Sequence, residues 1–399
     1  MNILVLHSAY KSNSPSGENQ VVDNEIRALT NRGHLVISPR LTASTPSISW
    51  LKIFLKNICL RRILPRGIYT YASKRFLIRN NIQLVHSHNI FPLIDLSIFD
   101  AARSLDIPMV FSIHNYRFLC INGLFFRDNQ ICTLCVNSNK FGRRYRCYKG
   151  SRILSALASK SQVEYLKYLK IASKIFVLNN VAKSFLIENG VDSRKIIHKR
   201  NFLQDRRIGP KKKHHPAKIA IWVGRIDASK GLRQLLKAWN ESNLPKNGFV
   251  LNVAGDGPLK EELEIAEKFN ESINFLGRKT FEELDELYAS ADFLLISSRW
   301  FEGFPTVIVE SAMHDLPVIA PKMGSFMDLT FESWVTLVDD THANWIKALN
   351  EQVSKKPYEK ARMWYLANCT EDKVMSDLIY HYEDSIFSNS NSNIPKRKD

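Results

Sequence analysis

Two glutamates stand eight residues apart in the segment WFEGFPTVIVE, residues 300–310. Gly303 and Pro305 predict a loop that runs into a helix, because proline is favoured at the first helical position. Backbone amides at a helix start attract phosphate. A carboxylate at Glu302 would repel phosphate, so it suits a sugar hydroxyl or a cationic centre. Glu310, about two turns further along, suits a ribose diol. The plainer alternatives are a solvated Glu302 and a buried, paired Glu310.

Two cations stand five residues apart in the segment VGRIDASKG, residues 223–231, at a predicted turn from strand to helix. Gly224 allows a sharp turn and a close approach to a ligand. The forked guanidinium of Arg225 and the point charge of Lys230 suit a diphosphate. The alternative is a pair of surface cations in a loop. A second glycine-rich strand end, AGDGP at residues 254–258, indicates by itself only a turn.

Strands and helices alternate along most of the chain, which predicts βαβ units with parallel sheets. The alternation breaks at RRIGPKKKHHPAK, residues 206–218, whose polar, basic and proline-containing composition indicates an interdomain linker. It then restarts at Lys218. A helical pattern spans about residues 357–387, and residues 388–399 indicate a frayed tail. Two doubly wound α/β domains in tandem predict a ligand site in the cleft between them, at the carboxyl ends of both sheets.

The formal charge of +17 lies in the first half of the chain. Residues 1–205 contain 30 Lys and Arg against 11 Asp and Glu, whereas residues 206–399 contain 26 against 28. Residues 51–79 hold eight basic side chains and no acidic one, with apolar residues interleaved. Such a stretch can lie on an anionic lipid surface, but it equally fits a solvated helix packing its apolar side on the core. Nucleic acid ranks last among the partners, because no nucleic-acid-binding module is evident.

The composition is that of an ordinary soluble protein, with 45% hydrophobic and 24% charged residues among 399. No apolar run approaches the ~20 residues that cross a bilayer, and no cleavable signal is evident. We therefore expect a cytoplasmic protein, or one peripheral on the inner face of the cell membrane. Its six cysteines are then more typical of thiols or metal ligands than of disulfides.

Four of the cysteines fall within one stretch, separated by 11, 2 and 11 residues. They are Cys120, Cys132, Cys135 and Cys147. A Cys-x2-Cys pair flanked by two further thiols suits a tetrahedral structural zinc site that would fix a long loop over about residues 116–150. Buried thiols or a stress-dependent disulfide are the alternatives.

Glu302 and Glu310 across Glu-Gly-Phe-Pro, preceded by Gly-Arg-x4-Lys-Gly and Ala-Gly-x-Gly-Pro, resemble glycosyltransferase family 4. The segments Pro317-Val-Ile-Ala and Ser-Gly17-Glu look like the family too, so the resemblance covers nearly the whole chain. It implies a retaining enzyme with the α/β GT-B fold, in which two doubly wound Rossmann-like domains face each other across a cleft.

The resemblance also implies roles for individual residues. Arg225 and Lys230 would hold the donor diphosphate, Glu310 the ribose, and Glu302 the transferred sugar, while His114 would face the reacting sugar and diphosphate. The remaining assignments are Gly303, Phe304, Pro305 and Thr306 for the phosphate-site amides, Arg278, Lys279 and Leu284 for the base pocket, Gly17 on the donor side, and His88 and Asn115 on the acceptor side. For His88, a strand-end polar residue is the alternative.

The chain departs from the family pattern at three places. The amino-terminal loop has Ser16-Gly17 instead of paired glycines, Asn201-Phe202 stands where the hinge usually reads Asn-Gly, and Asn115 replaces the usual Asp after the strand-end histidine. The last two bear on hinge geometry and acceptor contacts more than on donor binding.

The function expected from this resemblance is sugar transfer from a UDP- or GDP-type donor to a hydroxyl of a saccharide acceptor. The charge asymmetry between the two halves of the chain further leads us to expect a lipid-linked or otherwise anionic acceptor at an anionic membrane surface, as in surface polysaccharide or lipopolysaccharide biosynthesis. No Asp-x-Asp occurs in the chain, so we expect catalysis without a metal or other cofactor. The alternative is a non-enzymatic basic protein that binds membrane or nucleic acid on a degenerate GT-B scaffold.

The expected domains follow from these assignments. They are an acceptor-binding Rossmann-like domain over 1–205, a linker over 206–217, a nucleotide-sugar-binding domain over 218–370, and a carboxy-terminal helix and tail over 371–399.

Overall fold

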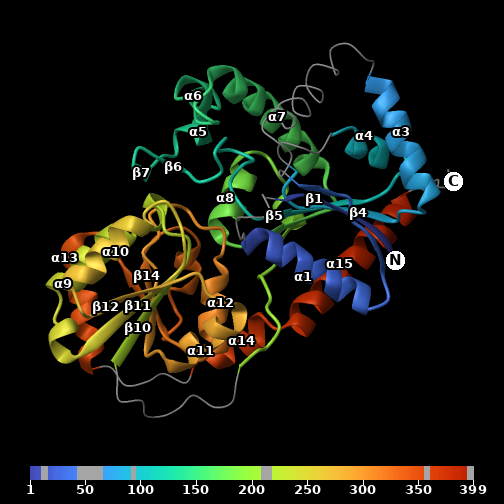
Figure 1. Ribbon diagram of the computed structural model, residues 1–399. Coiled ribbons are helices and arrows are strands. Elements are labelled where there is room, and N and C mark those ends of the chain that lie inside the picture. Colours follow the sequence, from blue (N-terminus) through green and yellow to red (C-terminus); the bar gives the residue numbers. More distant parts are fainter. Residues whose placement is uncertain (10–16, 43–65, 91–95, 208–217, 355–359, 393–399) are drawn as a thin grey trace. The chain divides into compact units, whose positions relative to one another are not determined.

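The computed structural model describes residues 1–9, 17–42, 66–90, 96–207, 218–354 and 360–392 (Figure 1). The chain divides into two compact units. The first contains residues 1–123, 134–200 and 371–399, and the second contains residues 124–133 and 201–370. Most of the basic stretch 51–79 and most of the predicted linker lie outside the described residues.

The first unit is built on a parallel sheet in the order β2-β1-β4-β5-β8-β9, with β3 also paired to β1. Apolar runs such as Leu4–Leu6 and Met109–Phe111 are buried, as expected where helices cover both faces of a parallel sheet. The strands are β1 (Asn2–Ala9), β2 (Leu35–Ile37), β3 (Arg40–Thr42), β4 (Leu84–Ser87), β5 (Met109–Ile113), β8 (Lys174–Val177) and β9 (Ile196–His198).

Helices cover both faces of this first sheet, with α1 and α15 on one face and α3 and α4 on the other (Figure 1). The helix α15 begins at Glu371 and brings the end of the chain back onto the first unit, where Arg32 holds Glu371 at 2.7 Å. The helices are α1 (Gly17–Asn31), α3 (Arg66–Arg79), α4 (Ser97–Ser104), α5 (Leu134–Asn137), α6 (Lys140–Arg144), α7 (Arg152–Ile171), α8 (Asn180–Glu188) and α15 (Glu371–Ser392), with a 3₁₀ turn η1 (Ser193–Lys195).

The second unit contains a six-stranded parallel sheet in the order β12-β11-β10-β13-β14-β15. Trp222 and Trp239 lie in its apolar core with Leu251 and Phe293. Its strands are β10 (Lys218–Val223), β11 (Phe249–Ala254), β12 (Ile273–Gly277), β13 (Phe293–Leu295), β14 (Val318–Pro321) and β15 (Val335–Val338).

The helices of the second unit follow its strands in alternation. They are α9 (Leu232–Glu241), α10 (Lys260–Phe269), α11 (Phe281–Ser290), α12 (Thr306–Met313), α13 (His342–Asn350) and α14 (Lys360–Asn368), with 3₁₀ turns η2 (Ala228–Lys230), η3 (Pro245–Asn247), η4 (Gly324–Leu329) and η5 (Glu351–Ser354). A two-stranded hairpin, β6 (Phe126–Arg127) and β7 (Gln130–Ile131), also belongs to this unit, and the Phe125 ring before it packs edge-on against Phe301 at 5.8 Å.

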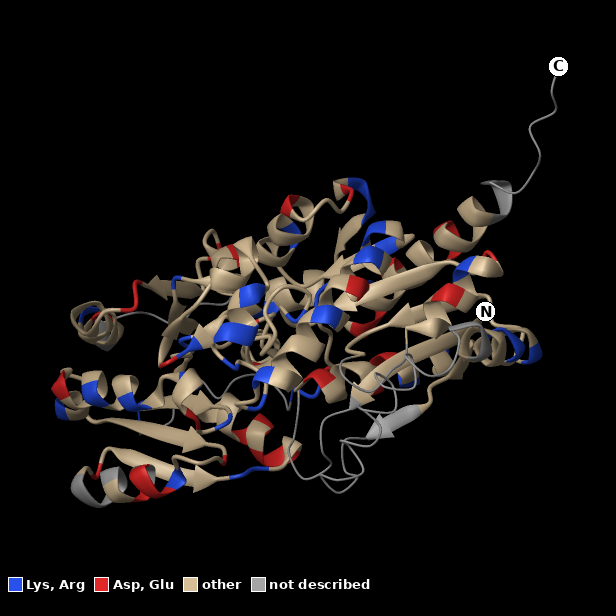
Figure 2. Ribbon diagram, turned by 90° about the horizontal axis from the view of Figure 1, so that it is seen from above, with Lys and Arg blue, Asp and Glu red and all other residues tan. Residues whose placement is uncertain are grey.

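Charged residues lie mainly on helices and loops, while the strands carry few of them (Figure 2). Among the described residues, no helix is both long and apolar enough to cross a membrane. The prediction of a frayed tail from residue 388 is wrong for its first part, because α15 continues to Ser392. Residues 393–399 lie outside the described part of the chain.

Candidate active site

The sheet of the second unit reverses its direction of growth between β10 and β13. From β10 the chain proceeds outward to β11 and β12, then returns to β13 on the other side of β10. Ligands of open α/β sheets bind at such a switch point, beside the carboxyl ends of the strands. The loops after β10 and β13 carry Arg225, Lys230 and Glu302, so the sheet brings together residues up to 77 positions apart in the sequence.

The loop after β10 is held in place by the burial and hydrogen bonds of its own residues. Ile226 is fully buried, and its amide donates to the Asp256 carbonyl at 2.9 Å. The Asp227 carboxylate accepts from the Ser229 amide at 2.9 Å and so caps the 3₁₀ turn η2 that ends in Lys230. Gly231 then takes a left-handed conformation, with φ of 67°, before α9 begins.

Glycines are required here by neighbouring backbone. A Cβ on Gly231 would lie 2.0 Å from the Ser297 carbonyl oxygen, and one on Gly255 would lie 1.9 Å from that of Gly224. A Cβ on Gly257 would meet the Ile226 carbonyl oxygen at 2.3 Å. The glycines of the AGDGP segment therefore let two loops pack together, a role beyond the simple turn predicted from the sequence.

Lys230 and Glu302 meet at this edge of the sheet. The Lys230 ammonium lies 2.5 Å from Glu302 Oε1, which also accepts a hydrogen bond from Ser298 Oγ at 2.7 Å. Glu302 is only 5% exposed, so the solvated carboxylate of the plainer alternative is wrong. The ammonium also lies 5.2 Å from the centroid of the Trp300 ring, within the range of a cation–π contact.

Arg225 occupies a more open position. Its side chain is 64% exposed, and its Nε donates to Asp227 Oδ2 at 2.5 Å. Asp227 thus caps η2 and orients the guanidinium with the same carboxylate. The guanidinium nitrogens not engaged by Asp227 leave donors for an anion.

Glu310 lies on α12, the helix that starts at Thr306 after Pro305. The Tyr288 hydroxyl donates to Glu310 Oε2 at 2.7 Å, and the Tyr288 ring stacks on His314 at 5.6 Å. Burial raises the pKa of Glu310 above its ordinary value of 4.5, although the bond from Tyr288 acts in the opposite direction. The geometry is that of the buried, paired carboxylate named above as the plainer alternative.

The residues predicted for the base pocket already have acidic partners. Arg278 lies 3.4 Å from Asp256, and Lys279 lies 3.0 Å from Glu283, which forms a capping box with Thr280. Leu284 is half-buried on α11. In the loop before α12, the Phe304 carbonyl accepts a hydrogen bond from Asn201 Nδ2 at 2.9 Å, so Asn201, from the unusual Asn-Phe pair, is tied to this loop.

In the first unit, the predicted histidines lie at the ends of neighbouring strands. His88 follows β4 and His114 follows β5, and His88 Nδ1 lies 2.8 Å from His114 Nε2. Asn115 donates to Glu18 Oε2 at 3.1 Å. Gly17 is the first residue of α1. The adjoining Glu18 carboxyl has a pKa raised by burial, even though His7 and Arg117 act to lower it.

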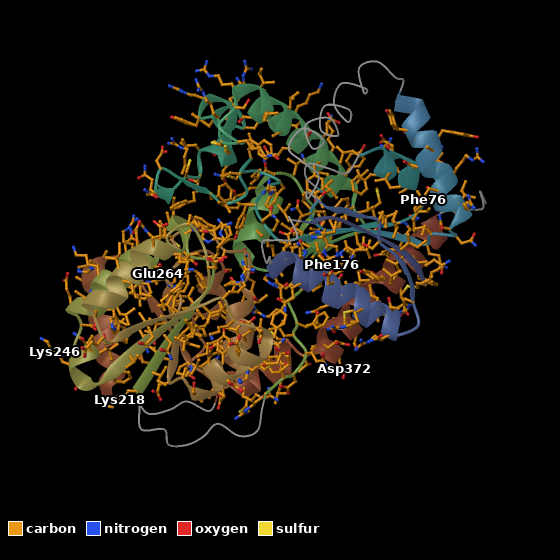
Figure 3. All side chains as sticks on the ribbon, in the orientation of Figure 1. Phe76, Phe176, Lys218, Lys246, Glu264 and Asp372 are labelled. Carbon is orange, nitrogen blue, oxygen red and sulfur yellow. The ribbon has the colours of Figure 1, made fainter. Side chains whose placement is uncertain are left out.

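Behind these histidines lies a buried charge cluster that was not predicted from the sequence. Glu25 on α1 is 1% exposed and ion-paired with Lys199, which follows β9. His86 Nδ1 lies 3.1 Å from Glu25 and 2.5 Å from the Tyr382 hydroxyl of α15. Phe176, labelled in Figure 3, lies edge-on to His86 at 5.9 Å. A sequence signal existed, because Glu25 interrupts an otherwise apolar helical stripe formed by Val21, Val22, Ala28 and Leu29.

The predicted zinc ligands are divided between the two units. Cys120, Cys135 and Cys147 belong to the first unit and Cys132 belongs to the second. None of the four is in a disulfide, and the Cys120 thiol donates to Asn122 Oδ1 at 2.9 Å. Among the described residues, only Glu25, His86 and His88 form a group of at least three His, Cys, Asp or Glu residues close enough to share a metal ion. The zinc site stays a prediction, which a metal assay on the purified protein can decide.

Two family models match the chain in succession. Residues 15–201 match the model described as Glycosyltransferase Family 4, and residues 204–367 match that described as Glycosyl transferases group 1. The chain therefore belongs to glycosyltransferase family 4. The expected fold is confirmed as α/β of the GT-B class, with two Rossmann-like units. That these units face each other across a cleft stays a prediction.

Curated relatives and solved structures agree with this assignment. The amylovoran biosynthesis glycosyltransferase AmsD of Erwinia amylovora is 35% identical over 101 residues, which are 25% of this chain and 27% of that protein. A GDP-mannose-dependent alpha-mannosyltransferase of Corynebacterium glutamicum is 30% identical over 189 residues, 42% of this chain and 40% of that protein. Three of the curated relatives match over 27%, 29% and 62% of their lengths, so the chain spans less than two thirds of each.

Among solved structures, Anabaena HepE in complex with UDP and glucose superposes with a TM-score of 0.63 at 14% identity. The superposition covers 96% of this chain and 100% of that chain. At this identity the likeness concerns the fold alone.

Proposed function

We propose that the chain is a retaining glycosyltransferase that moves a sugar from a UDP- or GDP-type donor to a hydroxyl of a saccharide acceptor in surface polysaccharide assembly. The observation that carries the proposal is the convergence of Lys230, Glu302 and the start of α12 at the switch point of the second sheet. The UDP in the HepE structure, the GDP-mannose of the mannosyltransferase and the polysaccharide role of AmsD support the donor and pathway classes.

The leaving diphosphate is the first requirement of this chemistry. Cleavage of a sugar–phosphate bond increases the negative charge on the diphosphate, and preorganised cations and helix amides stabilise that charge. Lys230 and Arg225 supply the cations, and the first turn of α12 supplies amides. Because Lys230 is paired with Glu302, the diphosphate competes with a carboxylate for the same ammonium. Donor binding therefore redirects an existing ion pair rather than ordering an unpaired lysine.

Glu302 is then placed for the transferred sugar. Its Oε1 accepts from Ser298 and Lys230, and a carboxylate oxygen carries further lone pairs that can accept from a sugar hydroxyl. Its negative charge also favours the positive character that develops at the anomeric carbon. Glu310 is assigned to the ribose, whose hydroxyls would share its carboxylate with Tyr288.

We assign charge stabilisation at the diphosphate to these cations rather than to a metal. Transfer that continues in EDTA supports this assignment, and transfer that stops in EDTA and returns with Mg²⁺ contradicts it. Retention of anomeric configuration is proposed from family membership, and NMR of the product linkage tests it directly.

The acceptor side is proposed to work at an anionic membrane surface. On α3, Tyr71 and Ile78 are 62% and 60% exposed, beside Lys74, Arg75 and Arg79. Exposed apolar and basic side chains on one helix without acidic residues suit a lipid surface. Liposome flotation at physiological salt should show binding that rises with anionic lipid content, and binding that ignores lipid charge contradicts this part.

The central experiment is a thermal-shift screen of uridine, guanosine and adenosine diphosphate sugars, followed by a turnover assay with the donor that stabilises the protein. Glu302→Gln should retain nucleotide binding but lower turnover by about 10²–10³-fold. Glu261→Gln, an exposed carboxylate on α10, is the matched control and should leave turnover unchanged. A protein that binds liposomes but neither binds nor turns over any nucleotide sugar would instead support the non-enzymatic alternative.

A further inference from the structure

Four side chains of the first unit form a continuous polar line from the interior of the unit to its surface. Lys199 binds Glu25, Glu25 Oε1 lies 3.4 Å from His88 Nε2, and His88 Nδ1 lies 2.8 Å from His114 Nε2. The first three are at most 6% exposed, whereas His114 is half-buried. The His88 and His114 ring planes differ by 17° with centroids 5.1 Å apart, the arrangement of two rings joined edge to edge by an N–H···N bond.

The charge states of this line follow from its surroundings. Burial alone would raise the pKa of Glu25, but the Lys199 ammonium and the imidazoles of His88 and His86 outweigh it, so the pKa lies well below the ordinary value. Burial lowers the pKa of His88 to about 3 and also holds that of His114 well below its usual range. At neutral pH the line therefore contains one carboxylate and two neutral imidazoles. Each neutral imidazole has one N–H donor and one lone pair.

The carboxylate decides which nitrogen carries each proton. Glu25 Oε1 and His88 Nε2 are buried, and neither makes a well-aligned hydrogen bond in the described chain, so their 3.4 Å separation is an electrostatic contact, as is the 3.1 Å separation of Oε1 from His86 Nδ1. An N–H on His88 Nε2 presents its positive end to the carboxylate, whereas a lone pair there would face a negative charge. His88 Nδ1 is then the acceptor, so His114 must donate from Nε2.

We infer that Glu25 is a positioning residue that acts through His88 to hold His114 in the Nε2–H form, with a bare Nδ1 as acceptor for a ligand hydroxyl. The inference rests on the proposed function only for the identity of that ligand, a saccharide hydroxyl. A bare nitrogen accepts a hydrogen bond from a hydroxyl and repels an acceptor oxygen. The line would therefore determine that His114 accepts, rather than donates, a hydrogen bond at Nδ1.

Glu25 and His88 of this line, together with His86, are also close enough to share a metal ion. The Lys199 ammonium is already bound to Glu25, and a divalent cation at the same buried carboxylate would be repelled by it. The paired carboxylate therefore favours the proton line over a metal, and a metal becomes an outcome of the test.

The test reads the proton positions directly. In the intact chain labelled with ¹⁵N-histidine, long-range ¹H–¹⁵N correlation distinguishes the two imidazole tautomers, and His114→Gln assigns the His114 signals. Wild type should show His114 as the Nε2–H tautomer. In Glu25→Gln the carboxamide can donate to His88 Nε2, so His114 should lose its single tautomer and populate the Nδ1–H form.

Two variants keep the test interpretable. Tyr382→Phe removes the buried bond to His86, which is not a member of the line, and it should leave the tautomer of His114 unchanged. Glu25→Gln combined with Lys199→Met removes both buried charges together, in case the single variant is unstable. In this double variant His114 should again populate the Nδ1–H form. A wild-type Nδ1–H form at His114, or an unchanged tautomer in folded Glu25 variants, overturns the proposal. So does one divalent metal per chain that Glu25→Gln abolishes.

Activity provides a separate readout. If the chain transfers sugars, Glu25→Gln should lower kcat about tenfold while the KM for the nucleotide sugar stays within twofold, because most of the proposed nucleotide contacts lie on the second unit. An unchanged kcat contradicts the positioning role. Wild-type protein without any turnover would contradict the proposed function alone, since the tautomers are read without substrate.

Discussion

The Lys230 ammonium lies 2.5 Å from the Glu302 carboxylate, so the groups assigned to the diphosphate and to the transferred sugar are each other's partner. Glu302 is buried and Lys230 is half-buried, so removing the lysine leaves a buried carboxylate unpaired and destabilises the protein. Stability and activity should therefore respond differently to single and double substitutions at this pair.

The first prediction is a double-mutant cycle at Lys230 and Glu302. Lys230→Met should destabilise the protein by about 3 kcal/mol, because it leaves Glu302 buried without its counter-ion. Adding Glu302→Gln should restore most of that loss, a coupling of about 2–3 kcal/mol in urea denaturation. Turnover should stay far below the wild-type value in both single variants and in the double variant. Additive stability effects would show that the pair is not coupled.

The second prediction concerns pH. Because burial raises the folded-state pKa of Glu310 above 4.5, ionising this carboxyl opposes folding. Its cost is absent below pH 4.5, grows as pH rises through the raised pKa, and is complete above it. Glu310→Gln should therefore raise Tm at pH 7.5 and lose this gain toward pH 4.5, while weakening nucleotide binding about tenfold or more. Glu261→Gln is the exposed control, and an equal gain at both pH values would contradict the burial argument.

The third prediction separates backbone strain from steric conflict at glycine. Gly248 has φ of 78°, and a Cβ added there would have no other atom within 4 Å, so Gly248→Ala should cost about 1–2 kcal/mol from conformation alone. Gly231→Ala adds a contact at 2.0 Å with the Ser297 carbonyl and should cost a further ~1–3 kcal/mol. It should also reduce turnover, because Lys230 precedes it. Equal losses of unfolding free energy would exclude the steric component.

The fourth prediction tests the return of α15 to the first unit. Tyr382 is fully buried beside His86, whereas Tyr380 on the same helix is 65% exposed. Tyr382→Ala should lower the free energy of unfolding by about 3–5 kcal/mol, and Tyr380→Ala by no more than about 0.5. Hydrogen exchange should place the Tyr382→Ala effect in the amides of β4 and α1. Similar effects of the two substitutions would show that α15 is not docked as described.

Much of the fold was predictable from the chain. Short apolar runs such as Ile219–Val223 and Val250–Ala254, separated by helical patterns, specify parallel strands because both faces of such a sheet are buried. The strand β15 and the helix α13 were not predicted, and the four residues of β15 are too short a run to give a clear strand pattern in the sequence. The return of α15 was also missed, because a helix pattern does not say which sheet the helix covers.

The sequence by itself determined which residue types stand at the ends of the strands: Arg225 and Lys230 after β10, Glu302 after β13, His88 and His114 after β4 and β5. The carboxyl ends of parallel strands lie at the same edge of a sheet. Residues that follow these strands in the sequence are therefore predicted to lie near one another within each unit. Only the tertiary structure decided the partners. Glu25 meets Lys199 across 174 residues, and Glu310 meets Tyr288 across 22. Such pairings depend on how helices pack on the sheet, and burial then fixes the charges and protons that these groups carry.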